Sequence, residues 1–303
     1  HVQTILGFMP GISRENQLSK KYLQMEDYGI VSISEVVNIS TISDSAPIVM
    51  VLPDYTGSRR LVEGIFEEVI TNHYRPILFQ GRGQGGNKLT TAKLLNYGDP
   101  SDLREVIQYL KYTYPNVIIS VVGIGSGADL LMSYCGEYGS SSYLQSAVCI
   151  SSTFDSETVY SEKIPKFYEI LYLSYFKSVI SRYFKTFSRI LDMRHVLKTW
   201  SVNQFTEQFY CKLSGVTNTE EFWEDNSPLR DVDEISTPVL CINSLDDPMC
   251  SNDVIPFDLF TSSHYMFLLT TDYGGHAGFV DGPFSKSWIA KSTIEYLKTL
   301  LEF

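Results

Sequence analysis

The chain has 303 residues, of which 44% are hydrophobic and 19% are charged, and its formal net charge is −11. This length and composition favour one large core, so a single domain with an insertion fits better than two independent domains. No basic cluster is dense enough to follow a phosphate backbone, so we expect no nucleic-acid ligand. A small or apolar ligand is expected instead.

Cysteine usage and the lengths of the apolar runs exclude further classes of protein. The five cysteines show no CxxC spacing, and Cys149 and Cys241 lie in apolar, strand-like runs. We therefore expect buried free thiols, no disulfide framework, no metal site and no cofactor. No apolar run approaches the ~18 residues that a membrane span needs. The triplet Asn38-Ile39-Ser40 is a glycosylation sequon, which has meaning only in a secretory context.

Strand and helix patterns alternate along most of the chain. Residues 22–25 and 30–37 indicate an opening hairpin, and helical spacing follows at 61–70, 101–110 and 288–301. Buried strands are expected at 48–52, 76–79, 116–120, 147–150, 238–243 and 265–269. Repeated strand–helix units with short connections predict an α/β fold, with a mostly parallel central sheet and helices on both faces.

The alternation stops between residues 154 and 233, where apolar residues follow helical spacing. We interpret residues 154–233 as an inserted helical cap, and residues 1–153 and 234–303 as the core. Most of the cap aromatics are expected to form its own core, although some could line an acyl tunnel. From Lys163 to Lys198 the cap carries eight basic and two acidic residues. These indicate either a solvated helix face or contact with an anionic membrane or head group.

A glycine-rich turn follows the strand at 116–120. Residues 121–131 (VVGIGSGADLL) lead from that strand into a helical pattern. Strand, glycine-rich turn and helix form the setting of the nucleophile elbow, in which a serine, cysteine or aspartate is exposed on a strained turn. Alone, the turn could equally cradle a phosphate.

Two later segments suit the rest of a catalytic triad. Asp246-Asp247-Pro248 follows one expected strand, and the loop containing His276 follows the next. The order of elbow, acid and histidine is that of an α/β-hydrolase. The histidine would move the nucleophile's proton, and the carboxylate would hold the imidazole tautomer. We choose Asp247 as the orienting acid, with Asp246 as the alternative; each segment could also be a simple turn.

Several segments together resemble one known family, the membrane-anchored α/β-hydrolase domain-containing proteins numbered one, two, three and fifteen. The segments that carry the resemblance are 1–4, 52–58, 79–83, 88–91, 134–137, 227–230 and 274–279. The resemblance implies the α/β-hydrolase fold, an ester or acylglycerol hydrolase ancestry and a role in lipid metabolism. It also implies one membrane anchor upstream of His1, hence a membrane-associated or secretory-pathway location.

The elbow departs from the family pattern. Where active members carry Gly-x-Ser-x-Gly, this chain has Gly125 at the nucleophile position and Ser126 directly after it. Glycine supplies no attacking atom. If Ser126 were the nucleophile, the bulky Ile124 would stand where the turn needs a small residue.

The oxyanion hole departs as well. The family register predicts donors at the backbone of Ser126 and at Tyr55 or Thr56. Asp54 stands where active relatives usually have glycine. Its carboxylate would oppose a developing oxyanion unless it points away or is paired.

Three functions follow from these residues. The first is a degenerate hydrolase that binds a lipid or acyl ester or regulates a partner protein. The second is a working lipid ester hydrolase that uses Ser126, His276 and Asp247. The third is an interaction module whose pocket is filled. The first predicts that the Ser126 hydroxyl lies out of hydrogen-bonding reach of His276.

Overall fold

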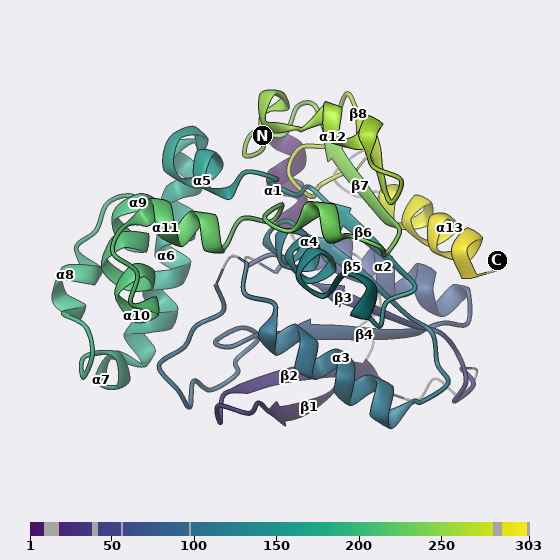
Figure 1. The fold of residues 1–303 in the computed structure, drawn as a ribbon, viewed down its shortest axis with the longest axis horizontal. Coiled ribbons are helices and arrows are strands. Elements are labelled where there is room, and N and C mark those ends of the chain that lie inside the picture. Colours follow the sequence, from purple (N-terminus) through teal and green to yellow (C-terminus); the bar gives the residue numbers. More distant parts are fainter. Residues whose placement is uncertain (9–17, 38–41, 56, 97, 281–286, 302–303) are drawn as a thin grey trace.

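The computed structural model describes residues 1–8, 18–37, 42–55, 57–96, 98–280 and 287–301 (Figure 1). The expected sequon at Asn38 and the expected oxyanion residue Thr56 lie outside these ranges. The chain folds into a sheet covered by helices, with a separate group of helices beside it (Figure 1).

The sheet has eight strands in the order β1-β2-β4-β3-β5-β6-β7-β8. The pairs β1–β2 and β2–β4 are antiparallel, and the remaining pairs are parallel. The strands are β1 (Leu18–Gln24), β2 (Ile30–Val36), β3 (Ile48–Leu52), β4 (Arg75–Gln80), β5 (Ile119–Ile124), β6 (Ser146–Ile150), β7 (Val239–Ser244) and β8 (Met266–Thr271). The predicted hairpin and the six further predicted strands are present, but β5 shares only residues 119–120 with its predicted range, and only Met266 of β8 is buried.

Helices cover both faces of the sheet. Every residue of β3, β5 and β6 is buried, as expected for parallel strands covered on both sides. One apolar cluster joins the sheet to α2 and α13, and another joins its opposite face to α3 and α4. The helices of the core are α1 (Val2–Phe8), α2 (Arg59–Thr71), α3 (Ser101–Thr113), α4 (Ser126–Tyr138), α12 (Phe257–Ser262) and α13 (Ile289–Leu301), with single turns η1 (Gly139–Ser141), η4 (Val232–Glu234) and η5 (Asn252–Val254).

Between β6 and β7 the chain forms short helices that lie to the left of the sheet in Figure 1. They share an aromatic-rich cluster of their own, within which the rings of Phe176 and Phe205 stack 5.6 Å apart. Tyr55, at the end of β3, belongs to the same cluster and connects the cap to the core. The cap elements are α5 (Ser156–Thr158), η2 (Val159–Lys163), α6 (Lys166–Arg182), α7 (Phe184–Phe187), α8 (Met193–Leu197), α9 (Val202–Phe205), η3 (Thr206–Cys211), α10 (Lys212–Ser214) and α11 (Thr219–Asp225).

The cysteines and the helices bear on further expectations from the sequence. All five cysteines are buried and free, as predicted. Within the described ranges, no helix has the length and apolar character to cross a bilayer. The same residues contain no group of three or more His, Cys, Asp or Glu side chains suited to holding a metal ion.

Candidate active site

The glycine-rich turn connects β5 to α4. Gly125 lies between them with φ 54° and ψ −120°, a positive φ that favours glycine. Its neighbours must also be small: a Cβ on Gly123 would lie 2.4 Å from the carbonyl oxygen of Gly127, and one on Gly127 would lie 2.2 Å from that of Leu52. Two glycines without room for a side chain therefore frame Gly125. This spacing places Gly125, rather than Ser126, at the centre of the elbow.

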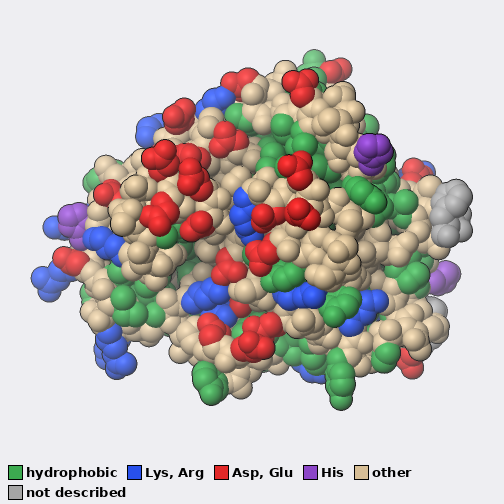
Figure 2. Space-filling view, in the orientation of Figure 1, with side chains coloured by type: hydrophobic (Ala, Val, Ile, Leu, Met, Phe, Trp, Pro, Cys, Tyr) green, Lys and Arg blue, Asp and Glu red, His purple; other side chains and the backbone are tan. Residues whose placement is uncertain are grey.

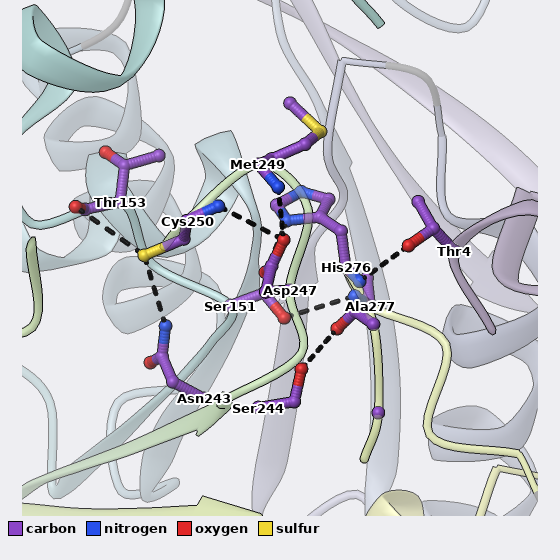
Figure 3. A network of polar contacts seen from close by, with 12 residues as sticks. Thr4, Ser151, Thr153, Asn243, Ser244, Asp247, Met249, Cys250, His276 and Ala277 are labelled. Carbon is purple, nitrogen blue, oxygen red and sulfur yellow. Dashed lines mark hydrogen bonds and ion pairs between the residues drawn. The ribbon is translucent and has the colours of Figure 1, made fainter. Parts of the chain in front are cut away.

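His276 and Asp247 form a buried pair after β8 and β7. Nδ1 of His276 lies 2.9 Å from Oδ2 of Asp247 (Figure 3). The other carboxylate oxygen accepts hydrogen bonds from the backbone N–H groups of Met249 at 2.7 Å and Cys250 at 3.1 Å. The backbone N–H of His276 donates to Oγ1 of Thr4 at 2.9 Å, so α1 helps to hold the histidine loop. The acid and the base are both fixed in place.

Asp246 has a different contact from Asp247. Its Oδ1 accepts hydrogen bonds from the backbone N–H groups of Gly274 at 2.8 Å and Gly275 at 2.7 Å. The adjacent acid thus fixes the backbone of the loop that carries His276, whereas Asp247 contacts the imidazole ring itself.

The free nitrogen of His276 faces the elbow. The ring is 1% exposed, and its Nε2 has no hydrogen-bond partner among the described residues. A Cβ added to Gly125 would lie 3.1 Å from Nε2. The imidazole therefore points at the place where a nucleophile's side chain would begin, and only a hydrogen atom is present there.

The carboxylate of Asp54 fills much of that space. Its Oδ1 would lie 2.9 Å from a Cβ on Gly125. The same oxygen accepts hydrogen bonds from the backbone N–H of Ser126 at 3.2 Å, from the Ser126 hydroxyl at 2.9 Å and from the Tyr172 hydroxyl at 3.1 Å. The N–H of Ser126 is the predicted first oxyanion donor, so a side chain of the protein occupies that half of the hole.

Ser126 and Tyr55 complete this closed arrangement. The backbone N–H of Tyr55 donates to Oγ of Ser126 at 3.0 Å, while that hydroxyl donates to Asp54. Ser126 therefore makes its hydrogen bonds to the loop after β3 and makes none to His276. The structure brings Ser126, Tyr55, Asp247 and His276 together around Gly125, but it does not join Ser126 to the histidine.

The surrounding carboxylates raise the pKa of His276. Burial by itself lowers this pKa, but the charge of Asp247 and its hydrogen bond, followed by the charges of Asp54 and Asp129, raise it to about 9. Burial raises the pKa of Asp129 to about 6, against the effect of its hydrogen bonds from Ser152 and Thr153. At neutral pH the imidazole is therefore protonated and cannot act as a general base.

Two residues of this site were not predicted from sequence. Tyr172 reaches Asp54 from α6, in the cap, and no local signal distinguishes it from the neighbouring cap aromatics. Asp129 lies one turn after Gly125 in α4, and its carboxylate accepts hydrogen bonds from the Ser152 hydroxyl at 2.7 Å and from the Thr153 backbone at 2.9 Å. An acid at the start of a helix with apolar neighbours is the one signal that could have found it.

Relatives match the chain over most or all of its length. Protein ABHD15 of Homo sapiens is 33% identical over 314 residues, covering 100% of this chain and 67% of that protein. Phospholipase ABHD3 of Bos taurus is 26% identical over 269 residues, covering 86% and 65%. Monoacylglycerol lipase of Saccharomyces cerevisiae is 26% identical over 268 residues, covering 84% and 60%. The chain thus spans about two thirds of these relatives' length. No protein-family model matches it.

Solved structures share the fold. The esterase Pf2001 of Pyrococcus furiosus has a TM-score of 0.62 and 18% sequence identity, covering 96% of each chain. An aryl esterase of Burkholderia cenocepacia, described as putative, has a TM-score of 0.58 and 14% identity, covering 94% of this chain and all of its own. These neighbours confirm the predicted α/β-hydrolase fold, and the 33% identity with ABHD15 across the whole chain confirms the predicted resemblance. The chain belongs to the α/β-hydrolase domain-containing family.

Proposed function

We propose that this chain is a degenerate hydrolase, which uses the former active site to bind a lipid or acyl ester, or to regulate a partner protein, instead of turning over substrate. The observation that carries the proposal is the elbow. Gly125 stands at the nucleophile position, and the Asp54 carboxylate accepts the hydrogen bond that an oxyanion would need. The site therefore lacks an attacking side chain, and one of the donors that would stabilise the oxyanion of a substrate is already occupied.

The expected loss of rate is large. Removing the nucleophile of a serine hydrolase costs on the order of a million-fold in kcat. A histidine acting through water contributes only about 10²- to 10⁴-fold, and it must be neutral to do so. Since the pKa of His276 is raised to about 9, little of that contribution remains at neutral pH.

A lipid or acyl ligand is supported by the relatives and by the cap. Two relatives are named a phospholipase and a monoacylglycerol lipase. Aromatic side chains from the cap pack against the loop after β3, since the ring of Phe176 lies 5.0 Å from that of Tyr55. An acyl chain bound beneath the cap would lie against these aromatic side chains, which are apolar as such a ligand requires.

The alternative is an active lipid ester hydrolase that uses Ser126, His276 and Asp247. The intact acid–base pair and the unbonded Nε2 of His276 favour it. This alternative requires the Ser126 hydroxyl to leave both Asp54 and Tyr55 and to reach Nε2 within about 2.6–3.2 Å.

A fluorophosphonate probe distinguishes the two functions. We expect the purified chain to remain unlabelled, while a monoacylglycerol raises its melting temperature. Ser178→Ala, on the exposed surface of α6, is the control. Labelling would establish the active hydrolase if it disappears in Ser126→Ala and persists in Ser178→Ala. No change in melting temperature with monoacylglycerols, phospholipids or fatty acids would overturn the proposed lipid binding.

A further inference from the structure

The outer face of α6 exposes large apolar side chains. Phe167 is 58% exposed and Ile170 is 59% exposed, and Leu171 lies beside them. Residues three and four apart share one side of a helix, so these three form a stripe along α6. The opposite side of α6, with Tyr172 and Phe176, packs into the cap cluster. Helix α6 therefore has two apolar sides, one that faces the protein and one that faces outward.

A tryptophan lies beside the same helix. Trp200 is 85% exposed, and the ammonium group of Lys177, which projects from α6, lies 5.9 Å from the centre of its ring. Helix α1 begins near the other end of the stripe, where the rings of His1 and Tyr168 stack 5.8 Å apart. An exposed tryptophan with an adjacent lysine is the pairing that membrane interfaces favour, because the indole has an apolar body and a polar N–H.

Basic residues lie at both ends of α6, and most of them are at or after its C-terminal end, away from the apolar stripe. Lys163 pairs with Asp253 and Lys166 pairs with Glu169. Lys177 donates to the Thr199 carbonyl, and the other five lack a carboxylate within ion-pairing distance among the described residues. They are Arg182 at the end of α6, Lys185 in α7, Arg189 in the following loop, and Arg194 and Lys198 in and after α8. Asp192, the nearby acid, caps α8 through the backbone N–H groups of Arg194 and His195.

The charges of the cap are segregated. Figure 2 shows acidic side chains gathered over α5 and α11, whereas Lys and Arg side chains project at the edge formed by α7 and α8. This segregation occurs in a protein whose net charge is −11. A solvated helix face needs neither the separation of charges nor the exposed aromatic and aliphatic side chains.

We propose that this face of the cap, formed by the outer side of α6, Trp200 and the unpaired basic residues of α6 to α8, docks on an anionic lipid bilayer. The apolar stripe and the indole enter the interface, and the Arg and Lys side chains contact anionic head groups. Docking would hold the cap, and the site beneath it, at the surface where lipids leave the bilayer. The inference stands on the cap surface alone and does not depend on whether the elbow is active.

Vesicle co-sedimentation of the whole chain tests the proposal. We expect binding to phosphatidylcholine vesicles that contain phosphatidylserine, little binding to phosphatidylcholine alone, and release at high salt. The double variant Arg189→Glu/Arg194→Glu should bind at least about thirtyfold more weakly, because two basic residues are lost at an anionic surface and two acidic residues replace them. Ile170→Ser/Trp200→Ser should lose at least about tenfold at every salt concentration, because the apolar contacts are not screened.

Matched controls lie on remote exposed surfaces. Lys291→Glu in α13 repeats the charge reversal, and Tyr112→Ser in α3 repeats the loss of an exposed aromatic; both should bind as the parent does. Equal binding to neutral vesicles, or equal loss in the controls, would overturn the proposal. It is also overturned if the parent ignores vesicles and instead forms a dimer that Ile170→Ser/Trp200→Ser dissociates. Asp54→Gly, which changes a buried residue beneath the cap and leaves the outer side chains of α6 in place, should leave vesicle binding unchanged, so a failure of the proposed function remains distinguishable.

Discussion

Restoring the missing nucleophile should not by itself restore a serine hydrolase. In Gly125→Ser, the new Cβ would lie 2.9 Å from Oδ1 of Asp54 and 3.1 Å from Nε2 of His276. The first distance is too short to persist, so the Asp54 carboxylate must move. That carboxylate is held by Ser126 and Tyr172, and the serine must also adopt a positive φ of 54°. We therefore expect Gly125→Ser to need a second change, Asp54→Gly.

The rate gained by adding Asp54→Gly to Gly125→Ser can be calculated from the oxyanion hole. While Oδ1 of Asp54 accepts the N–H of Ser126, that N–H cannot stabilise an oxyanion. Losing one such donor costs about 10²- to 10³-fold in kcat. The double variant Gly125→Ser/Asp54→Gly should thus react with a fluorophosphonate at least about 100-fold faster than Gly125→Ser. Asp54→Gly alone should not react, because it has no nucleophile.

Labelling rates of these variants, measured at one pH with a fluorescent fluorophosphonate, provide the assay. Gly125→Ser/Asp54→Asn separates charge from volume, since asparagine keeps the shape of the side chain and removes its negative charge. If Gly125→Ser reacts as fast as the double variant, Asp54 does not block the oxyanion hole and the reasoning fails. Labelling of Asp54→Gly alone that is lost on adding Ser126→Ala would show instead that Asp54 restrains Ser126.

Two further predictions concern stability. The folded chain holds the His276 proton with a pKa of about 9, against 6.5 for an ordinary histidine, so unfolding releases a proton between these values. The free energy of unfolding should therefore be highest below pH 6.5 and fall by up to about 3 kcal/mol as the pH rises to 9, and His276→Gln should flatten this slope in urea titrations. Arg82, 2% exposed, donates to Asp102 at 2.6 Å and to Asp27 at 2.6 Å. Arg82→Met should lower the free energy of unfolding by about 3–5 kcal/mol, because it leaves buried Asp102 unpaired.

Each stability prediction has its own control. For the histidine, the comparison is the difference between parent and variant at each pH, since lysines, tyrosines and thiols also titrate near pH 9. Parallel curves would show that His276 does not retain its proton in the folded chain. For the arginine, Arg82→Met/Asp102→Leu should recover part of the lost stability; a further loss would show that the unpaired carboxylate is not the cause.

The sequence determined most of the fold. Buried strands such as β3 and β6 were predicted because a parallel sheet covered on both faces demands continuous apolar runs. The order of elbow, acid and histidine placed Gly125, Asp247 and His276 at the carboxyl ends of their strands. Chain order and local composition are sufficient for these features, because each depends on a few neighbouring residues and on the known connectivity of the fold.

The tertiary structure decided what the site contains. The sequence indicated that Asp54 was unusual, but not whether its carboxylate would point away or enter the oxyanion hole. That outcome depends on Tyr172, which reaches Asp54 across 118 positions of the chain, and on the rotamer of Ser126. Only the fold shows which cap aromatics are buried and that Phe167 and Trp200 face outward. Hydrogen bonds and burial between distant segments depend on packing, and local sequence patterns do not encode packing.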